Sequence, residues 1–143
     1  MKEVQIYVDG CSLTNPGQSG CGVLLVCGDA TKELIIPIGH ATNNRAELQA
    51  MIEGMKALKT VCDVDLYSDS EVTVKASGFA IGTKQYARNS NMDLWSEWNR
   101  ITKGYTIETL RVHHVRKDTH ELNTRARALA NEAANESALA AQE

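Results

Sequence analysis

The sequence lacks the features that usually identify membrane, secreted and metal-cluster proteins. No apolar run approaches the roughly 20 residues that a membrane-spanning helix needs, and the opening stretch MKEVQIYVDG has neither the charged nor the apolar region of a leader peptide. The four cysteines show no paired spacing of the kind that binds metal. These absences argue against membrane insertion, and we expect a reduced, cytoplasmic setting.

An excess of basic residues is also missing. The chain has 15 Lys and Arg against 18 Asp and Glu, which gives a formal net charge of −3 and a pI near 5.8. Such a chain has no general attraction to nucleic acid or to an anionic membrane, so an anionic partner must be held by local groups. Its 143 residues, 43% of them hydrophobic, suit one domain with its own core. We expect a single domain over residues 1–143.

Alternating apolar and polar side chains predict strands in the first third of the chain. The first run begins at Val4 and ends at Asp9, and shorter apolar runs cover residues 21–28 and 32–39. Because Gly and Asp bound these runs closely, we expect an antiparallel meander, with Pro37 near a sheet edge.

The rest of the chain mixes helical spacing with further alternating runs. Residues 43–59 carry an apolar stripe at helical spacing with Glu47 near its start, and an alternating run at 63–70 includes Asp69. Four more segments are predicted: a short helix or loop at 71–80, a helix from about 91, a strand at 105–115, and a helix from 123 to about 141. This order indicates an α/β class (mixed α+β), a mixed sheet with helices packed on it.

Three acidic residues occupy positions that such a fold could bring together. Asp9 and Asp69 end strands, and Glu47 stands near a helix start. Carboxylates repel one another unless protons or cations neutralise them, and oxygen ligands of this kind favour Mg²⁺ or Mn²⁺. Each acid alone is more often a cap or a solvated side chain, so the interpretation depends on the flanking residues.

Those flanking residues form four linked motifs, YVDGCSLTNPGQSGCGVLL, TNNRAELQAMIEGMKAL, LYSDSEVTV and NMDLW. In order and approximate spacing they resemble type 1 ribonuclease H over nearly the whole chain. The resemblance implies a ribonuclease H-like fold with a five-stranded mixed sheet. It also implies a monomeric endonuclease that acts on RNA/DNA hybrids, cuts the RNA strand and leaves 5′-phosphate ends.

The resemblance also assigns roles to individual residues. Asp9, Glu47 and Asp69 match three of the four metal-binding acids of the family, with Asp9 bridging two Mg²⁺ or Mn²⁺ ions, Asp69 on the water-activating ion, and Glu47 on the second ion and beside the ribose 2′-hydroxyl. Six residues match substrate contacts. Ser12, Asn15, Asn43 and Asn44 correspond to minor-groove contacts, and Thr42 and Asn91 to a pocket for a DNA-strand phosphate.

The fourth acid is where the chain departs from the family. In NTRARALAN, Asn123 takes the family's Asn position and Arg127 takes the position of the catalytic aspartate. Asn123 could supply a neutral ligand one helical turn away, or it could be a plain helix N-cap. Asp118 and Glu121 are further candidates, and Arg127 could instead leave water as the ligand.

Two more departures affect substrate binding and proton transfer. The segment between Asp69 and NMDLW is short, and its basic residues Lys75, Lys84 and Arg88 are sparse, so we expect weak, less salt-dependent hybrid binding. His120 is the one histidine in the loop before the last helix; it could assist proton transfer or be incidental. The alternative function is a catalytically impaired module that binds hybrids or double-stranded RNA.

Overall fold

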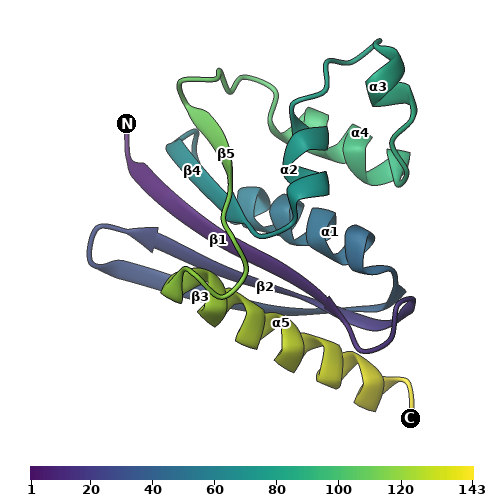
Figure 1. Cartoon of the computed structure of the whole chain (residues 1–143). Coiled ribbons are helices and arrows are strands. Elements are labelled where there is room, and N and C mark those ends of the chain that lie inside the picture. Colours follow the sequence, from purple (N-terminus) through teal and green to yellow (C-terminus); the bar gives the residue numbers. More distant parts are fainter.

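Five strands form one mixed sheet in the order β3-β2-β1-β4-β5, as the computed structural model of all 143 residues shows (Figure 1). The strands are β1 (Glu3–Ser12), β2 (Gly17–Cys27), β3 (Ala30–Ala41), β4 (Asp63–Ser68) and β5 (Leu110–His114). The helices are α1 (Asn43–Lys56), α2 (Glu71–Ser77), α3 (Lys84–Ala87), α4 (Met92–Ile101) and α5 (Glu121–Ala140). Strands β1 to β3 are antiparallel and β4 and β5 run parallel to β1, which confirms the meander, the mixed sheet and the edge position of Pro37 on β3.

Several element boundaries differ from the predicted ones. β1 does not end at Asp9 but continues to Ser12, because β2 keeps pairing with it as far as Ser12 opposite Ser19. A short helix, α3, lies between the segments predicted at 71–80 and from about 91, where no helix was expected, and β5 begins at Leu110 rather than at Tyr105. The last helix starts at Glu121, with the His120 side chain accepting a hydrogen bond from a backbone amide as its N-cap, so the alternative of Asn123 as the cap is wrong.

Helices cover both faces of the sheet, with α1, α2 and α4 on one side and α5 on the other (Figure 1). The larger core lies under α1 and α4, where alternate residues of β1 and β4 such as Ile6, Val8 and Leu66 are fully buried. On the opposite face, α5 lies directly on β2: a Cβ at Gly22 would come within 2.1 Å of the Ala126 carbonyl oxygen. The glycine therefore brings α5, and with it Arg127, close to the strands.

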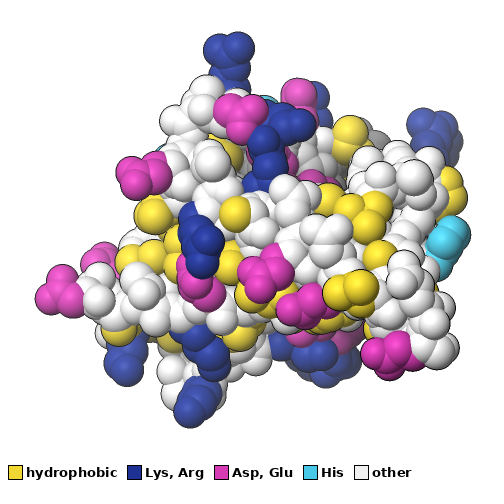
Figure 2. All heavy atoms as spheres, turned by 90° about the horizontal axis from the view of Figure 1, so that it is seen from below, with side chains coloured by type: hydrophobic (Ala, Val, Ile, Leu, Met, Phe, Trp, Pro, Cys, Tyr) yellow, Lys and Arg dark blue, Asp and Glu magenta, His cyan; other side chains and the backbone are white.

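The outer face of α5 carries charges of both signs. Lys and Arg side chains are interspersed with Asp and Glu across the face in Figure 2, and Arg125 on α5 is paired with Glu33 on β3. This face therefore presents no extended basic surface to a polyanion. No helix combines the length and the hydrophobicity of a membrane span.

Candidate active site

The parallel register of β1 and β4 places Asp9 beside Asp69. The last paired residues of these strands are Tyr7 and Tyr67. Asp9 follows Tyr7 by two residues, and Asp69 follows Tyr67 by two residues. β4 stops at Ser68 and the chain turns into α2, whereas β1 continues alongside β2. The two carboxylates therefore sit at the same level, where the two strands separate.

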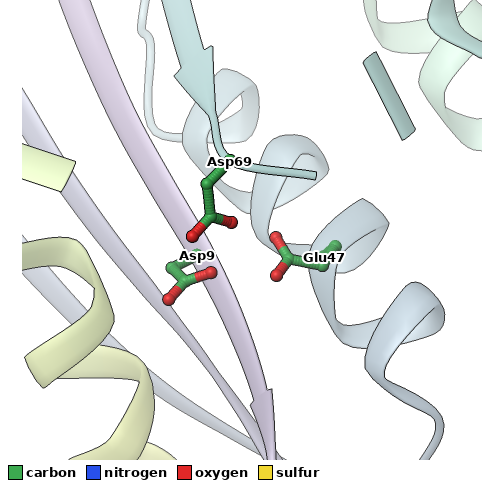
Figure 3. Close-up of side chains that lie close together, drawn as sticks. All are labelled: Asp9, Glu47 and Asp69. Carbon is green, nitrogen blue, oxygen red and sulfur yellow. The ribbon is translucent and has the colours of Figure 1, made fainter. Parts of the chain in front are cut away.

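Helix α1 brings the third carboxylate to the same place. Thr42 caps this helix by accepting a hydrogen bond from the amide of Arg45, so Glu47 falls in its second turn. Gly10 permits the close approach, since a Cβ there would lie 2.3 Å from the backbone nitrogen of Glu47. The side chains of Asp9, Glu47 and Asp69 converge (Figure 3), with ligand oxygens that all lie within 4.8 Å of one another.

Burial makes this carboxylate cluster electrostatically costly. Asp9 and Glu47 are 4% and 9% exposed. Burial raises the pKa of Asp9 to about 6, with repulsion from Asp69 adding to the rise and Arg127 opposing it. Burial and repulsion from Asp9 raise the pKa of Glu47 well above its usual range. A cation among the three groups would remove this cost.

One basic residue reaches the cluster. The guanidinium of Arg127 lies 3.7 Å (Nε) from Oδ2 of Asp9 and 3.5 Å (Nη2) from Oδ2 of Asp69, and its Nη1 donates a 2.6 Å hydrogen bond to Asp118. Arg127 thus does not turn away from the site. Asp118, one of the candidate replacement acids, pairs with Arg127.

Asn123 lies on α5 one turn before Arg127, but the structure does not bring it into the cleft. Its amide nitrogen donates a 3.3 Å hydrogen bond to the carbonyl oxygen of Val8, and its amide oxygen is buried without a partner. The cleft of about 350 Å³ beside the acids is lined by Arg127 and not by Asn123. The predicted role of Asn123 as a metal ligand is therefore without support from this arrangement.

The predicted minor-groove residues form a connected set at one side of the cleft. Oδ1 of Asn15 accepts a hydrogen bond of 3.0 Å from the Asn43 amide, and Oδ1 of Asn43 accepts one of 3.1 Å from the Ser12 amide. Ser12, Asn43 and Asn44 line the cleft, while Asn15 orients Asn43 from the neighbouring turn. The bonds tie the turn after β1 to the start of α1.

Thr42 and Asn91, predicted to bind a phosphate, are linked through one arginine. The amide of Arg45 donates to Thr42, and its Nη1 donates to Oδ1 of Asn91 at 3.2 Å. Asn91 adopts a left-handed backbone conformation (φ 63°) before α4, and the Arg45 guanidinium forms two hydrogen bonds with Asp93. The pair is therefore held in place by Arg45, a residue that the sequence analysis left without a role.

Comparisons with known proteins agree with this geometry. A family model described as RNase H matches residues 1–138. The chain belongs to the RNase H family. It is 39% identical over 142 residues to a ribonuclease H of Cupriavidus pinatubonensis, covering 92% of this chain and 94% of that one. A ribonuclease H of Helicobacter acinonychis is 43% identical over 112 residues, covering 75% and 77%.

Solved RNase H structures share the fold. RNase H1 from the halophilic archaeon Halobacterium salinarum superposes with a TM-score of 0.70 at 34% identity, covering 94% of this chain and 98% of that chain. LC11-RNase H1, determined in complex with an RNA/DNA hybrid, has a TM-score of 0.77 at 27% identity with the same coverage of 94% and 98%. The resemblance to type 1 ribonuclease H and the expected RNase H-like fold are confirmed.

The three acids of this RNase H chain fit a divalent cation. Oε2 of Glu47 is buried without a hydrogen-bond partner, which is unusual for a carboxylate oxygen and is resolved if a cation lies next to it. Asp9 and Asp69 present oxygens to the same space, and all three ligands are of the hard type that Mg²⁺ and Mn²⁺ prefer.

Other cleft residues were missed by the sequence analysis. Lys117, Cys11, Ser70 and Asn131 also line the cleft, and the Cys11 thiol donates to Oδ1 of Asn131 at 2.8 Å. The spacing of four between Arg127 and Asn131 on one helix face was the available signal for Asn131. His120 is not among the lining residues; it caps α5 and packs against Tyr7 with ring centroids 5.0 Å apart.

Proposed function

We propose that the chain hydrolyses the RNA strand of RNA/DNA hybrids, with Asp9, Glu47 and Asp69 as the residues that hold Mg²⁺ or Mn²⁺. The observation that carries this proposal is the buried, unpartnered oxygen of Glu47 within a cluster of three convergent carboxylates. Held by these three acids, the metal would supply activation of the attacking water and stabilisation of the leaving 3′ oxygen, in the family generally through two ions. The products are a 5′-phosphate and a 3′-hydroxyl.

The residues around the acids supply binding and selectivity. Ser12, Asn43 and Asn44 line the same cleft as the acids and carry hydroxyl and amide groups suited to base edges and sugars in a minor groove. Glu47 reaches the cleft from α1 about one helical turn after Asn43 and Asn44. This proximity supports the proposal that Glu47 contacts the ribose 2′-hydroxyl beside the cut. Thr42 and Asn91, held by Arg45, are proposed to hold a phosphate of the DNA strand.

The test is cleavage of an end-labelled RNA/DNA hybrid with Mg²⁺ and with Mn²⁺, and with a chelator as the metal-free control. We expect metal-dependent internal cuts in the RNA strand with 5′-phosphate ends. A matched pair of variants, Asp9→Asn in the cluster and Asp29→Asn in an exposed turn, separates loss of the site from loss of one negative charge. Binding of hybrid without cleavage under any metal condition would favour the alternative, an impaired binding module.

A further inference from the structure

The cluster contains a fixed cation of its own. Arg127 faces Asp9 and Asp69 at 3.7 and 3.5 Å, and its hydrogen bond to Asp118 anchors the far edge of the guanidinium. Its side chain is 25% exposed, against 51% for Arg125 on the same helix. A guanidinium keeps its charge at any working pH and is planar, with donors in a fixed fork, so it can face several carboxylates together.

Arg127 and Glu47 approach the two aspartates from different sides. In Figure 3 the ribbon of α5 lies on one side of Asp9 and Asp69, and Glu47, from α1, lies on the other. Arg127 forms ion pairs with both aspartates and none with Glu47. The aspartates therefore face a third carboxylate on the α1 side and a positive charge on the α5 side.

The charges of the carboxylates and of Arg127 limit how many divalent ions the site can hold and on which side they can bind. The three ionised carboxylates carry three negative charges, which one divalent ion and one guanidinium neutralise together. Asp118, which pairs with Arg127, and Lys117, which lines the cleft, add one charge of each sign and leave this sum unchanged. An additional divalent ion would leave the site with two excess positive charges. It would also have to bind on the α5 side, where Arg127 offers repulsion in place of a ligand.

We propose that Arg127 substitutes for one of the two metal ions, so that the site holds a single divalent ion between Asp9, Glu47 and Asp69 and the guanidinium supplies the remaining positive charge. The inference rests on the proposed function, because it concerns the same three acids. With an acid at residue 127, the site would carry four negative charges, which two divalent ions would balance. With Arg127 in that place, one divalent ion is enough, so a basic residue here is compatible with a metal-dependent site.

The experiment counts Mn²⁺ ions directly. Mn²⁺ is titrated calorimetrically into the native chain, and the protein is also mixed with Mn²⁺ and RNA/DNA hybrid, frozen before turnover, and examined by electron paramagnetic resonance. Two ions about 4 Å apart give an exchange-coupled spectrum, whereas one ion gives the spectrum of isolated Mn²⁺. Arg127→Asp is compared with Arg125→Asp, which makes the same change of charge on the same helix at a residue paired with Glu33.

We expect one isolated ion in the native chain and in Arg125→Asp, and a coupled pair in Arg127→Asp. A coupled pair in the native chain would overturn the inference and leave the proposed function standing, and so would a single ion in a folded Arg127→Asp variant. No bound Mn²⁺ at all would overturn the three-acid metal site and this inference with it. If Arg127→Asp fails to fold by circular dichroism, Arg127→Glu, which also supplies a fourth carboxylate, takes its place with the same expectation.

Discussion

Replacing Asp9 by Asn should stabilise the metal-free protein, by an amount that depends on pH. The pKa of Asp9 is raised from 3.8 to about 6, chiefly by burial. A raised pKa means that the folded state disfavours the ionised carboxylate, so the native chain loses stability as pH rises from about 4 to about 6. The difference of about two pKa units corresponds to about 3 kcal/mol, which Asp9→Asn recovers above pH 6. Below pH 4 the carboxyl is protonated in both states, and the gain disappears.

The assay is thermal and urea unfolding of native, Asp9→Asn and Asp29→Asn chains at pH 4 and pH 8 in the presence of a chelator. A gain of about 3 kcal/mol corresponds to roughly 6–12 °C in Tm for a chain of this size. Divalent metal at about a thousand times its Kd should reverse the order, because it binds only the cluster with all three carboxylates and there stabilises the native chain by about 4.1 kcal/mol. Equal stability of Asp9→Asn and native protein at pH 8, or a gain of the same size at pH 4, would refute the reasoning from buried charge.

The remaining predictions concern activity. Asp9→Asn and Glu47→Gln should each abolish hybrid cleavage while circular dichroism shows an intact fold; an unchanged rate in either variant argues against the metal-site assignment. RNA/DNA hybrid should be cut well ahead of single-stranded RNA, and a DNA duplex not at all, in gel assays with matched sequences; equal cutting of the DNA duplex would exclude the ribonuclease assignment. Arg127→Asp should lower the Mn²⁺ concentration required for cleavage at least severalfold. Asn123→Asp should not lower it, because the amide of Asn123 bonds to the backbone of Val8 outside the cleft; the opposite result would restore Asn123 as the ligand. Raising the salt concentration should weaken hybrid binding with a shallow slope, because few basic residues are available, and a steep slope measured by anisotropy would contradict this.

Much of the fold could be predicted because its signals are local. Alternation in β1 and β4 and the apolar stripe of α1 each follow from one periodicity, and the structure contains all three elements. The end of β1 could not be predicted in the same way. It depends on pairing with β2 across a turn, so the strand continues past Asp9 to Ser12 although the sequence there is rich in turn-forming residues.

The convergence of the three acids was predicted from the motifs, but its consequences depend on tertiary contacts. Helix α5 begins at Glu121 rather than at Asn123, because His120 serves as its cap. Within this helix Asn123 lies against the backbone of β1, and Arg127, one turn later, lines the cleft. No periodic pattern in an alanine-rich helix determines its start to within two residues, and none shows which face of the helix packs on the sheet.

The close packing that makes it costly to ionise Asp9 and Glu47 also prepares them to bind a cation. Gly10 lets α1 approach β1 so closely that Glu47 is removed from water, and one of its oxygens is left without a partner. A cation that enters this space regains interactions that water would otherwise have supplied, so the stability lost in the metal-free chain becomes affinity for the ion. Arg127 compensates the two aspartates on the α5 side but does not reach Glu47. The uncompensated part of the cluster therefore lies on the α1 side, beside Asn43 and Asn44, which line the cleft and which we propose contact the RNA strand.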